Sequence, residues 1–107
     1  MTDYTIILVT AGSEAEAEII AKALVAERLA ACVNIISPMR SIYRWEEKIR
    51  DDREWLLVIK TQAERFGAVE ARVKALHSYQ VPEVIALPIL AGAEGYLRWL
   101  LGETTAQ

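Results

Sequence analysis

The feature that most constrains this chain is the way its hydrophobic residues change period along the sequence. Residues 4–10 form a run rich in β-branched residues, which is typical of a buried strand, and further strands are predicted at 31–36, 39–45, 48–60 and 81–89. Between them, apolar residues recur three and four positions apart, which is the spacing of an amphipathic helix. The elements therefore follow the order β-α-β-β-α-β, and residues 96–101 predict a short additional helix near the C-terminal end.

Two capping signals mark where the main helices begin. Ser13 is followed three residues later by Glu16, which is the pattern of a capping box. Thr61 and Glu64 repeat this pattern ahead of apolar residues spaced as in a helix over 66–76. We therefore expect one helix to open at Ser13 and another at Thr61.

The middle of the chain predicts two long strands joined near Glu46-Glu47. We expect Ser37-Pro38 to end the strand at 31–36, because proline cannot donate a hydrogen bond to a sheet. The charged run at 50–53 interrupts the second long strand, and we expect a twist or a bulge there.

This element order predicts a ferredoxin-like α+β sandwich with a short C-terminal helix. The crossover connections are right-handed, so both main helices pack on one face of the sheet. A chain of 107 residues is long enough for a single core, and we treat residues 1–107 as one domain.

Composition excludes several classes of function. A net charge of −3 argues against general nucleic-acid binding, which requires a basic surface. No apolar run approaches the roughly 20 residues of a membrane span. The acidic N-terminus lacks the basic start of a leader, and a single cysteine allows no internal disulfide, so we expect a cytoplasmic protein.

The two long strands also predict an oligomer. At about 3.3 Å per residue, residues 39–60 extend further than a small sheet is wide. Strand edges that are left uncovered promote aggregation, and pairing with neighbouring copies is the simplest way to cover them. We therefore expect a closed homo-oligomer.

The sequence offers little for catalysis. A nucleophile needs a base, and His77 is the only histidine, while Cys32 is the only cysteine. The segment 10–13 has one glycine and no arginine, so it does not form a phosphate cradle of the acylphosphatase kind. The acidic charge also argues against an RNA-recognition domain, and we expect no enzymatic activity.

Metal binding is a stronger hypothesis. One chain cannot supply the nitrogen and sulfur ligands of a structural zinc site, but imidazole and carboxylate oxygens suit Cu(II). We predict His77 as a copper ligand, with Glu83 as a second ligand and Cys32 as a further candidate. The structural alternatives are that His77 caps a helix C-terminus and that Cys32 is a small buried hydrophobe.

Aromatic and charged residues predict a cleft. Tyr43 and Trp45 alternate along a strand and so share one face, and Tyr79 and Trp99 supply further aromatic rings. Lys60 stands at a strand end, where it binds an anion or pairs with Glu83. These residues form either a ligand cleft between subunits or simple packing at an interface.

Several motifs carry a resemblance to a known family. They are Ala30-Ala-Cys-Val-Asn34, Ser41-Ile-Tyr-Arg-Trp-Glu46, Lys60-Thr61, His77-x-Tyr-x-Val-Pro-Glu83, Ala86-Leu-Pro-Ile89 and Tyr96-Leu-x-Trp99. Together they resemble the CutA-type divalent-cation tolerance family, over nearly the whole chain. Ser78, Glu47 and Val9 depart from the usual pattern of that family, and Glu47 would carry strain in a turn with positive φ.

The resemblance implies a ferredoxin-like, PII-like homotrimer whose long hairpins pair between subunits. It also implies tolerance of copper and other divalent cations, without enzymatic activity. We therefore expect a cytoplasmic homotrimer that binds Cu(II) or another divalent metal. The alternatives are a PII-like trimer that takes an organic anion at Lys60 or Arg44, and a scaffold for protein interactions.

Overall fold

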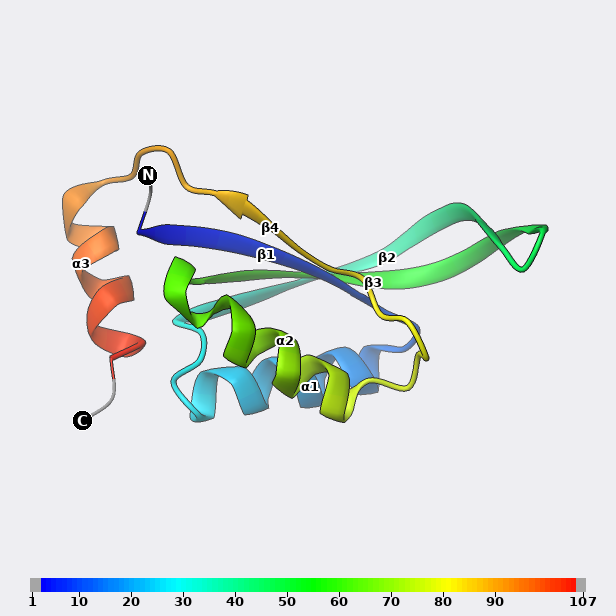
Figure 1. Cartoon of the computed structure of the whole chain (residues 1–107), viewed down its shortest axis with the longest axis horizontal. Helices are drawn as coiled ribbons and strands as arrows, with labels where there is room; N and C mark the ends of the chain where they lie inside the picture. Colours follow the sequence, from blue (N-terminus) through cyan, green and yellow to red (C-terminus); the bar gives the residue numbers. More distant parts are fainter. Residues whose placement is uncertain (1–2, 106–107) are drawn as a thin grey trace.

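The fold is a four-stranded antiparallel sheet with two helices packed on one face (Figure 1). The computed structural model describes residues 3–105. The strands are β1 (Tyr4–Ala11), β2 (Cys32–Trp45), β3 (Lys48–Gln62) and β4 (Val84–Pro88). The helices are α1 (Glu14–Ala26), the 3₁₀ turn η1 (Ala63–Arg65), α2 (Phe66–Leu76) and α3 (Glu94–Glu103).

The strands lie side by side in the order β2-β3-β1-β4, and every neighbouring pair is antiparallel. This order, with α1 and α2 as the crossovers, is the ferredoxin-like arrangement, so the predicted fold class is confirmed. The predicted C-terminal helix is confirmed as α3, which lies at the end of the sheet opposite the β2–β3 hairpin (Figure 1). No helix within residues 3–105 is long and apolar enough to cross a membrane.

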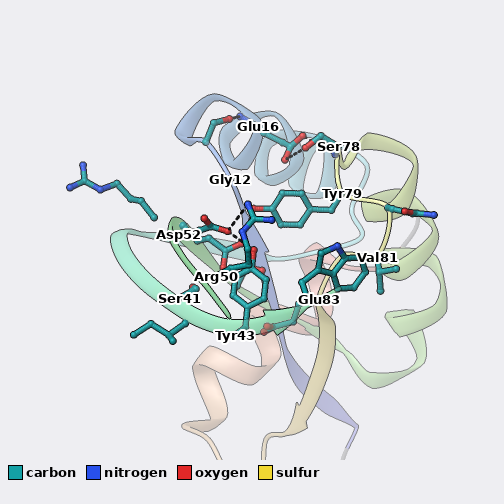
Figure 2. A pocket seen from close by; sticks show the side chains of 17 residues that line it. Gly12, Glu16, Ser41, Tyr43, Arg50, Asp52, Ser78, Tyr79, Val81 and Glu83 are labelled. Carbon is teal, nitrogen blue, oxygen red and sulfur yellow. Dashed lines mark hydrogen bonds and ion pairs between the residues drawn. The ribbon is translucent and has the colours of Figure 1, made fainter. Parts of the chain in front are cut away.

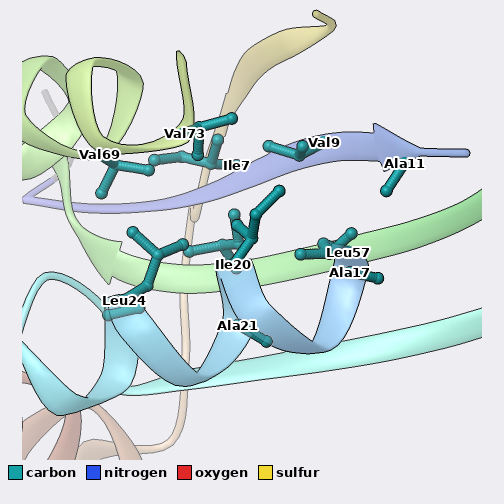
Figure 3. Packing of buried hydrophobic residues seen from close by; sticks show 12 residues of the cluster. Ile7, Val9, Ala11, Ala17, Ile20, Ala21, Leu24, Leu57, Val69 and Val73 are labelled. Atoms are coloured by element: carbon teal, nitrogen blue, oxygen red, sulfur yellow. The ribbon is translucent and has the colours of Figure 1, made fainter. Parts of the chain in front are cut away.

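The core lies between the sheet and the two helices. Alternate residues of β1 and β3 point towards the helices, and Ile7, Val9, Leu57 and Ile59 are all fully buried there. Figure 3 shows how side chains from both helices pack against them. The helix residues of this cluster are Ala17, Ile20, Ala21 and Leu24 of α1, with Val69 and Val73 of α2.

The first helix begins as the sequence predicts. The Ser13 hydroxyl accepts a hydrogen bond from the Glu16 backbone N–H at 3.1 Å, which is the N-cap contact of a capping box.

The second predicted helix start is wrong. Thr61 belongs to β3, where its hydroxyl donates to the Leu29 carbonyl at 2.7 Å instead of capping a helix. The chain enters α2 through the η1 turn, and the N-cap residue Arg65 makes no side-chain cap bond. A buried threonine thus satisfies its hydroxyl across the fold, which a local sequence pattern does not reveal.

The strand boundaries need two further corrections. Ser37-Pro38 does not end a strand, because β2 continues through it from Cys32 to Trp45. The pairing shift of this ribbon lies between Ile36 and Met39, while residues 50–53 pair regularly with β2. The predicted bulge at 50–53 is therefore wrong. The last strand is also shorter than predicted, since it begins at Val84 instead of Val81.

The shift at Pro38 sets which way the hairpin side chains point. Val33 and Ile35 partner Ile59 and Leu57, whose side chains face the helices. One extra residue in β2 then reverses the alternation, because side chains in a strand change face at every residue. As a result Tyr43 and Trp45, which partner Arg50 and Lys48, point to the opposite face.

The hairpin extends beyond the rest of the sheet. Pairing between β1 and β3 ends at Ala11 and Trp55, so residues 48–54 of β3 pair only with β2. Its tip is a two-residue turn in which Glu46 and Glu47 have φ of 49° and 65°, so the expected positive φ at Glu47 is confirmed. The molecule is 44 Å long as a result.

The sheet face away from the helices carries exposed apolar side chains. Leu87 and Ile85 of β4 are 48% and 50% exposed, and Ile36 of β2 is 52% exposed. Register places Leu87 opposite Ile6 and Ile85 opposite Leu8, and these β1 residues alternate with the buried Ile7 and Val9. An exposed apolar face of this kind, on a sheet that has helices on one side only, is typical of a surface that packs against another protein chain.

Candidate functional site

A cleft of about 1020 Å³ lies between the projecting part of the β2–β3 hairpin, the turn before α1 and the loop before β4 (Figure 2). Side chains from all three segments face it. The lining residues with chemistry are Glu16, Tyr43, Trp45, Arg50, Asp52, Arg53, Glu54, Tyr79 and Glu83. The cleft is thus built by segments that are distant in sequence, and one chain is enough to form it.

Tyr79 closes one wall of the cleft. Its hydroxyl donates to Glu54 Oε2 at 2.8 Å, and its backbone N–H donates to His77 Nδ1 at 3.0 Å. Burial raises the pKa of the Tyr79 phenol strongly, and the hydrogen bond to Glu54 adds to this rise. The Tyr79 ring lies against Gly12, where there is no side chain in its way.

His77 fixes the start of this loop. It follows the last residue of α2 as the C-cap, so the structural alternative of a helix C-cap is confirmed. Its side chain is 0% exposed, and Nε2 lies 2.6 Å from the Thr10 carbonyl oxygen. Because Nδ1 accepts the Tyr79 N–H, Nε2 carries the proton and donates to Thr10. A metal at His77 would have to replace one of these two bonds.

Tyr43 and Asp52 form a second pair in the cleft. The Tyr43 hydroxyl donates to Asp52 Oδ2, and the pKa of Tyr43 is raised mainly by that hydrogen bond. Arg50 Nη2 lies 3.7 Å from Asp52 Oδ2, and Figure 2 shows Arg50, Asp52 and Tyr43 together at the cleft wall. The charge of Asp52 is therefore balanced within the hairpin.

Two further carboxylates face the cleft from different elements. Glu54 of β3 is only 5% exposed, and Glu83 lies just before β4. Burial raises the pKa of the Glu83 carboxyl, and the negative charge of Glu54 raises it further. The two groups therefore share a negative potential that favours a cation.

The structure brings some of the predicted site residues together and separates others. Tyr43, Trp45, Tyr79 and Glu83 line the one cleft. Lys60 is not among its lining residues, and its ammonium donates instead to Asn34 Oδ1. The pairing of Lys60 with Glu83 that we considered is thus not formed in this chain.

Trp99 lies at the other end of the molecule, on α3. It lines a smaller cavity of about 380 Å³ with the C-terminal end of α1. Its ring stands 5.5 Å from that of Tyr96, measured between ring centres. Trp99 therefore does not take part in the cleft of one chain.

Cys32 also lies apart from the other two predicted metal ligands. It starts β2 opposite Lys60, is half-buried, and its thiol lies 3.8 Å from Asn34 Oδ1. Across residues 3–105, no three His, Cys, Asp or Glu side chains come close enough together to hold a metal ion. A metal site using His77, Glu83 or Cys32 stays a prediction that needs ligands from water or from another chain.

Sequence reasoning missed Asp52, Glu54 and Gly12. The charged run at 50–53 resembles a solvated surface, and only the strand alternation separates the residues that face the cleft. The pairing of β2 with β3 would have identified them, since Glu54 lies opposite Met39 and Asp52 lies opposite Ser41, on the same face as Tyr43. The sequence does not give this pairing, because it depends on the extra residue beside Pro38.

The fold and the cleft define a ferredoxin-like α+β protein with a projecting hairpin and a polar, aromatic cleft. The model of the CutA1 divalent ion tolerance protein family matches residues 5–103. The chain belongs to this family. This agrees with the resemblance in its motifs, and the family is named for tolerance of divalent ions rather than for a reaction.

Curated relatives and solved structures agree with this assignment. The chain is 52% identical to the divalent-cation tolerance protein CutA of Thermus thermophilus, over 92% of this chain and 96% of that protein. It is 43% identical to the chloroplastic protein CutA of Arabidopsis thaliana, over 92% of this chain but only 54% of that protein.

Two solved structures give the same fold. The divalent cation tolerance protein (Cut A1) of Thermus thermophilus superposes with a TM-score of 0.93 at 51% identity, covering 95% of this chain and 99% of that one. The periplasmic divalent cation tolerance protein CutA of Archaeoglobus fulgidus gives a TM-score of 0.93 at 42% identity, with the same coverage.

Proposed function

We propose that this protein is a non-enzymatic divalent-cation tolerance protein that acts as a homotrimer and binds Cu(II) or another divalent metal. Membership of the family supports the cation. The observation that carries the proposal is the carboxylate pair of Glu54 and Glu83. Both face one cleft, and their charges make its electrostatic potential more negative.

The pair supplies only part of a metal's coordination. Carboxylate oxygens bind hard divalent cations, and Cu(II) also accepts them beside imidazole nitrogen. Glu83 is the ligand we propose first, because it is exposed to the cleft. His77 is buried and does not line the cleft, so it becomes a ligand only if it gives up its hydrogen bond with Thr10 or Tyr79. Water or a neighbouring chain completes the site.

The homotrimer is supported by surfaces that one chain leaves open. The edge of β2 is free along its length, and β3 has a free edge over residues 48–54. The sheet face with Ile36, Ile85 and Leu87 is apolar and uncovered. Neighbouring copies would satisfy both the strand edges and the apolar face, as the resemblance implies.

A cytoplasmic location is part of the proposal. It rests on the single cysteine, which cannot form an internal disulfide. Disulfides are typical of small proteins in oxidising compartments and are rare in the cytoplasm. Relatives are named as chloroplastic and as periplasmic proteins, so location differs within the family.

Calorimetric titration with Cu(II) tests the metal proposal. We expect Glu83→Gln to weaken binding by about tenfold, the loss of one charged ligand, and Glu64→Gln, an exposed carboxylate outside the cleft, to leave it unchanged. If His77 is a ligand, affinity falls at acid pH, because imidazole must be unprotonated to coordinate a metal, and His77→Ala abolishes that fall. Equal affinity in the wild type and Glu83→Gln would refute the carboxylate assignment.

A further inference from the structure

We propose that the cleft also binds a small organic ammonium ion, held between its aromatic side chains and the carboxylates of Glu54 and Glu83. This goes beyond metal tolerance, because it names a second class of ligand for the same cleft. It follows from three observations: the charges that remain unpaired, the aromatic walls and the size of the space.

Two of the four cleft carboxylates are already satisfied. Glu16 accepts hydrogen bonds from the Ser78 backbone N–H at 2.9 Å and from the Ser78 hydroxyl at 3.1 Å. Asp52 accepts the Tyr43 hydroxyl and lies 3.7 Å from the Arg50 guanidinium. Neither carboxylate needs a ligand.

Glu54 and Glu83 are not satisfied in this way. Neither makes an ion pair with a cationic side chain within residues 3–105, although Arg53 also lines the cleft. Glu54 is 95% removed from solvent, and in the described part of the chain its side chain has one hydrogen bond, to Oε2 from Tyr79. Its second oxygen, Oε1, receives no hydrogen bond from the described residues and is not sealed from solvent. A cation in the cleft can therefore reach Oε1 and pair with the carboxylate.

The aromatic walls decide which cation fits. Tyr43, Trp45 and Tyr79 line the same space as the two carboxylates. The faces of such rings attract desolvated organic cations and most of all quaternary ammonium groups, whereas a hydrated metal ion gains little from them. A cleft of about 1020 Å³ is large enough for a small organic molecule rather than a bare ion.

This ligand differs from the alternative drawn from the sequence, in which an organic anion binds at Lys60 or Arg44. Neither of these residues lines the cleft. Its charged lining consists of Glu16, Asp52, Glu54 and Glu83 against Arg50 and Arg53. The net charge is negative, so the cleft attracts a cation and repels an anion.

The test is a titration of the intact protein with choline and with 3,3-dimethylbutan-1-ol, the uncharged carbon isostere of choline. We expect choline to bind at least about fivefold more tightly, the factor that corresponds to roughly 1 kcal/mol of cation–π and ionic attraction. Equal binding of the two probes, or no binding of choline, overturns the proposal. This comparison uses the wild-type protein alone, so no variant has to fold.

A matched pair of tryptophan variants locates the site. Trp45 and Trp99 are 39% and 44% exposed, but only Trp45 lines the cleft. We expect Trp45→Leu to weaken choline binding about fivefold and Trp99→Leu to leave it unchanged. Equal effects of both variants would place the ammonium elsewhere and refute the assignment.

Competition separates this proposal from the metal proposal. Cu(II) and choline would both use Glu83, so saturating Cu(II) should displace choline, and Trp45→Leu should leave Cu(II) affinity unchanged. If choline fails to bind while Cu(II) binds, only the ammonium proposal falls. If Cu(II) fails while choline binds in preference to its isostere, only the metal proposal falls.

Discussion

The hydroxyl of Tyr79 lies over the backbone of Gly12, so close that a β-carbon built on Gly12 would sit 2.8 Å from the Tyr79 oxygen. The same hydroxyl donates to Glu54. Glycine at position 12 therefore lets the turn before α1 approach the loop before β4, and it keeps one wall of the cleft in place.

Gly12→Ala should destabilise the protein and disturb the cleft. The added methyl group would push the Tyr79 hydroxyl off Glu54, and losing a hydrogen bond to a charged group costs about 2 kcal/mol. Chemical denaturation measures the loss. The control is Gly67→Ala in α2, where a β-carbon meets nothing within 4 Å, and which should gain up to about 1 kcal/mol in a helix. A Gly12→Ala protein as stable as the wild type would show that Tyr79 does not need this space.

At the hairpin tip, introducing a glycine should stabilise the protein. Glu47 has φ of 65° in a two-residue turn, a conformation that glycine adopts without cost. Glu47→Gly should therefore stabilise the protein by about 1 kcal/mol, measured as the free energy of unfolding. Lys48→Gly, one residue further and inside β3, should instead destabilise it by roughly 0.5–1 kcal/mol. Destabilisation by both changes would contradict the strain at Glu47.

Three tyrosines should lose their phenolic protons only at unusually high pH. The pKa values of Tyr43, Tyr79 and Tyr96 are all raised, and that of Tyr79 is raised most strongly, through burial and Glu54. A folded-state pKa above the unfolded value means that the native state holds its proton longer, so stability falls as the pH rises above about 10.

Ultraviolet absorbance of phenolate follows this titration. We expect Tyr79→Phe to remove the latest step and to flatten the loss of stability at alkaline pH. Tyr4→Phe is the control, because Tyr4 does not line the cleft. An alkaline stability profile that is the same in the wild type and in Tyr79→Phe would refute the role of the Tyr79 proton.

Assembly should depend on the open face of the sheet. Leu87 is 48% exposed on that face, and Leu87→Glu would place a charge in an interface that we propose to be buried. We expect sedimentation to show a trimer for the wild type and smaller species for Leu87→Glu. Ile19→Glu, which changes an exposed residue on α1 in the helix layer, should remain trimeric. A wild-type monomer would rule out the trimer.

The sequence predicts the element order and the fold well, because hydrophobic periodicity depends on which residues face the core. It fails where a single residue changes the geometry. The extra residue beside Pro38 reverses the alternation of β2, and it decides that Tyr43 shares a face with Asp52 and Glu54. Nothing in the spacing of the apolar residues marks that reversal.

The site was predicted in part for the same reason. Tyr43, Trp45, Tyr79 and Glu83 stand out by composition, and the structure gathers them in one cleft. Lys60 was added because it ends the predicted strand, but register puts it opposite Cys32. Long-range contacts such as Tyr79 to Glu54 and His77 to Thr10 depend on how α2 and β4 meet the sheet, which no local pattern encodes.

The most direct test of cation binding is a crystal soaked in Cu(II), with an anomalous difference map recorded at the copper edge. We expect a peak inside the cleft within about 2.0–2.2 Å of a Glu83 carboxylate oxygen, with its other ligands from water, His77 or a neighbouring chain. A map with no peak in the cleft, in crystals where copper is bound only at exposed surface positions, would contradict the proposed function.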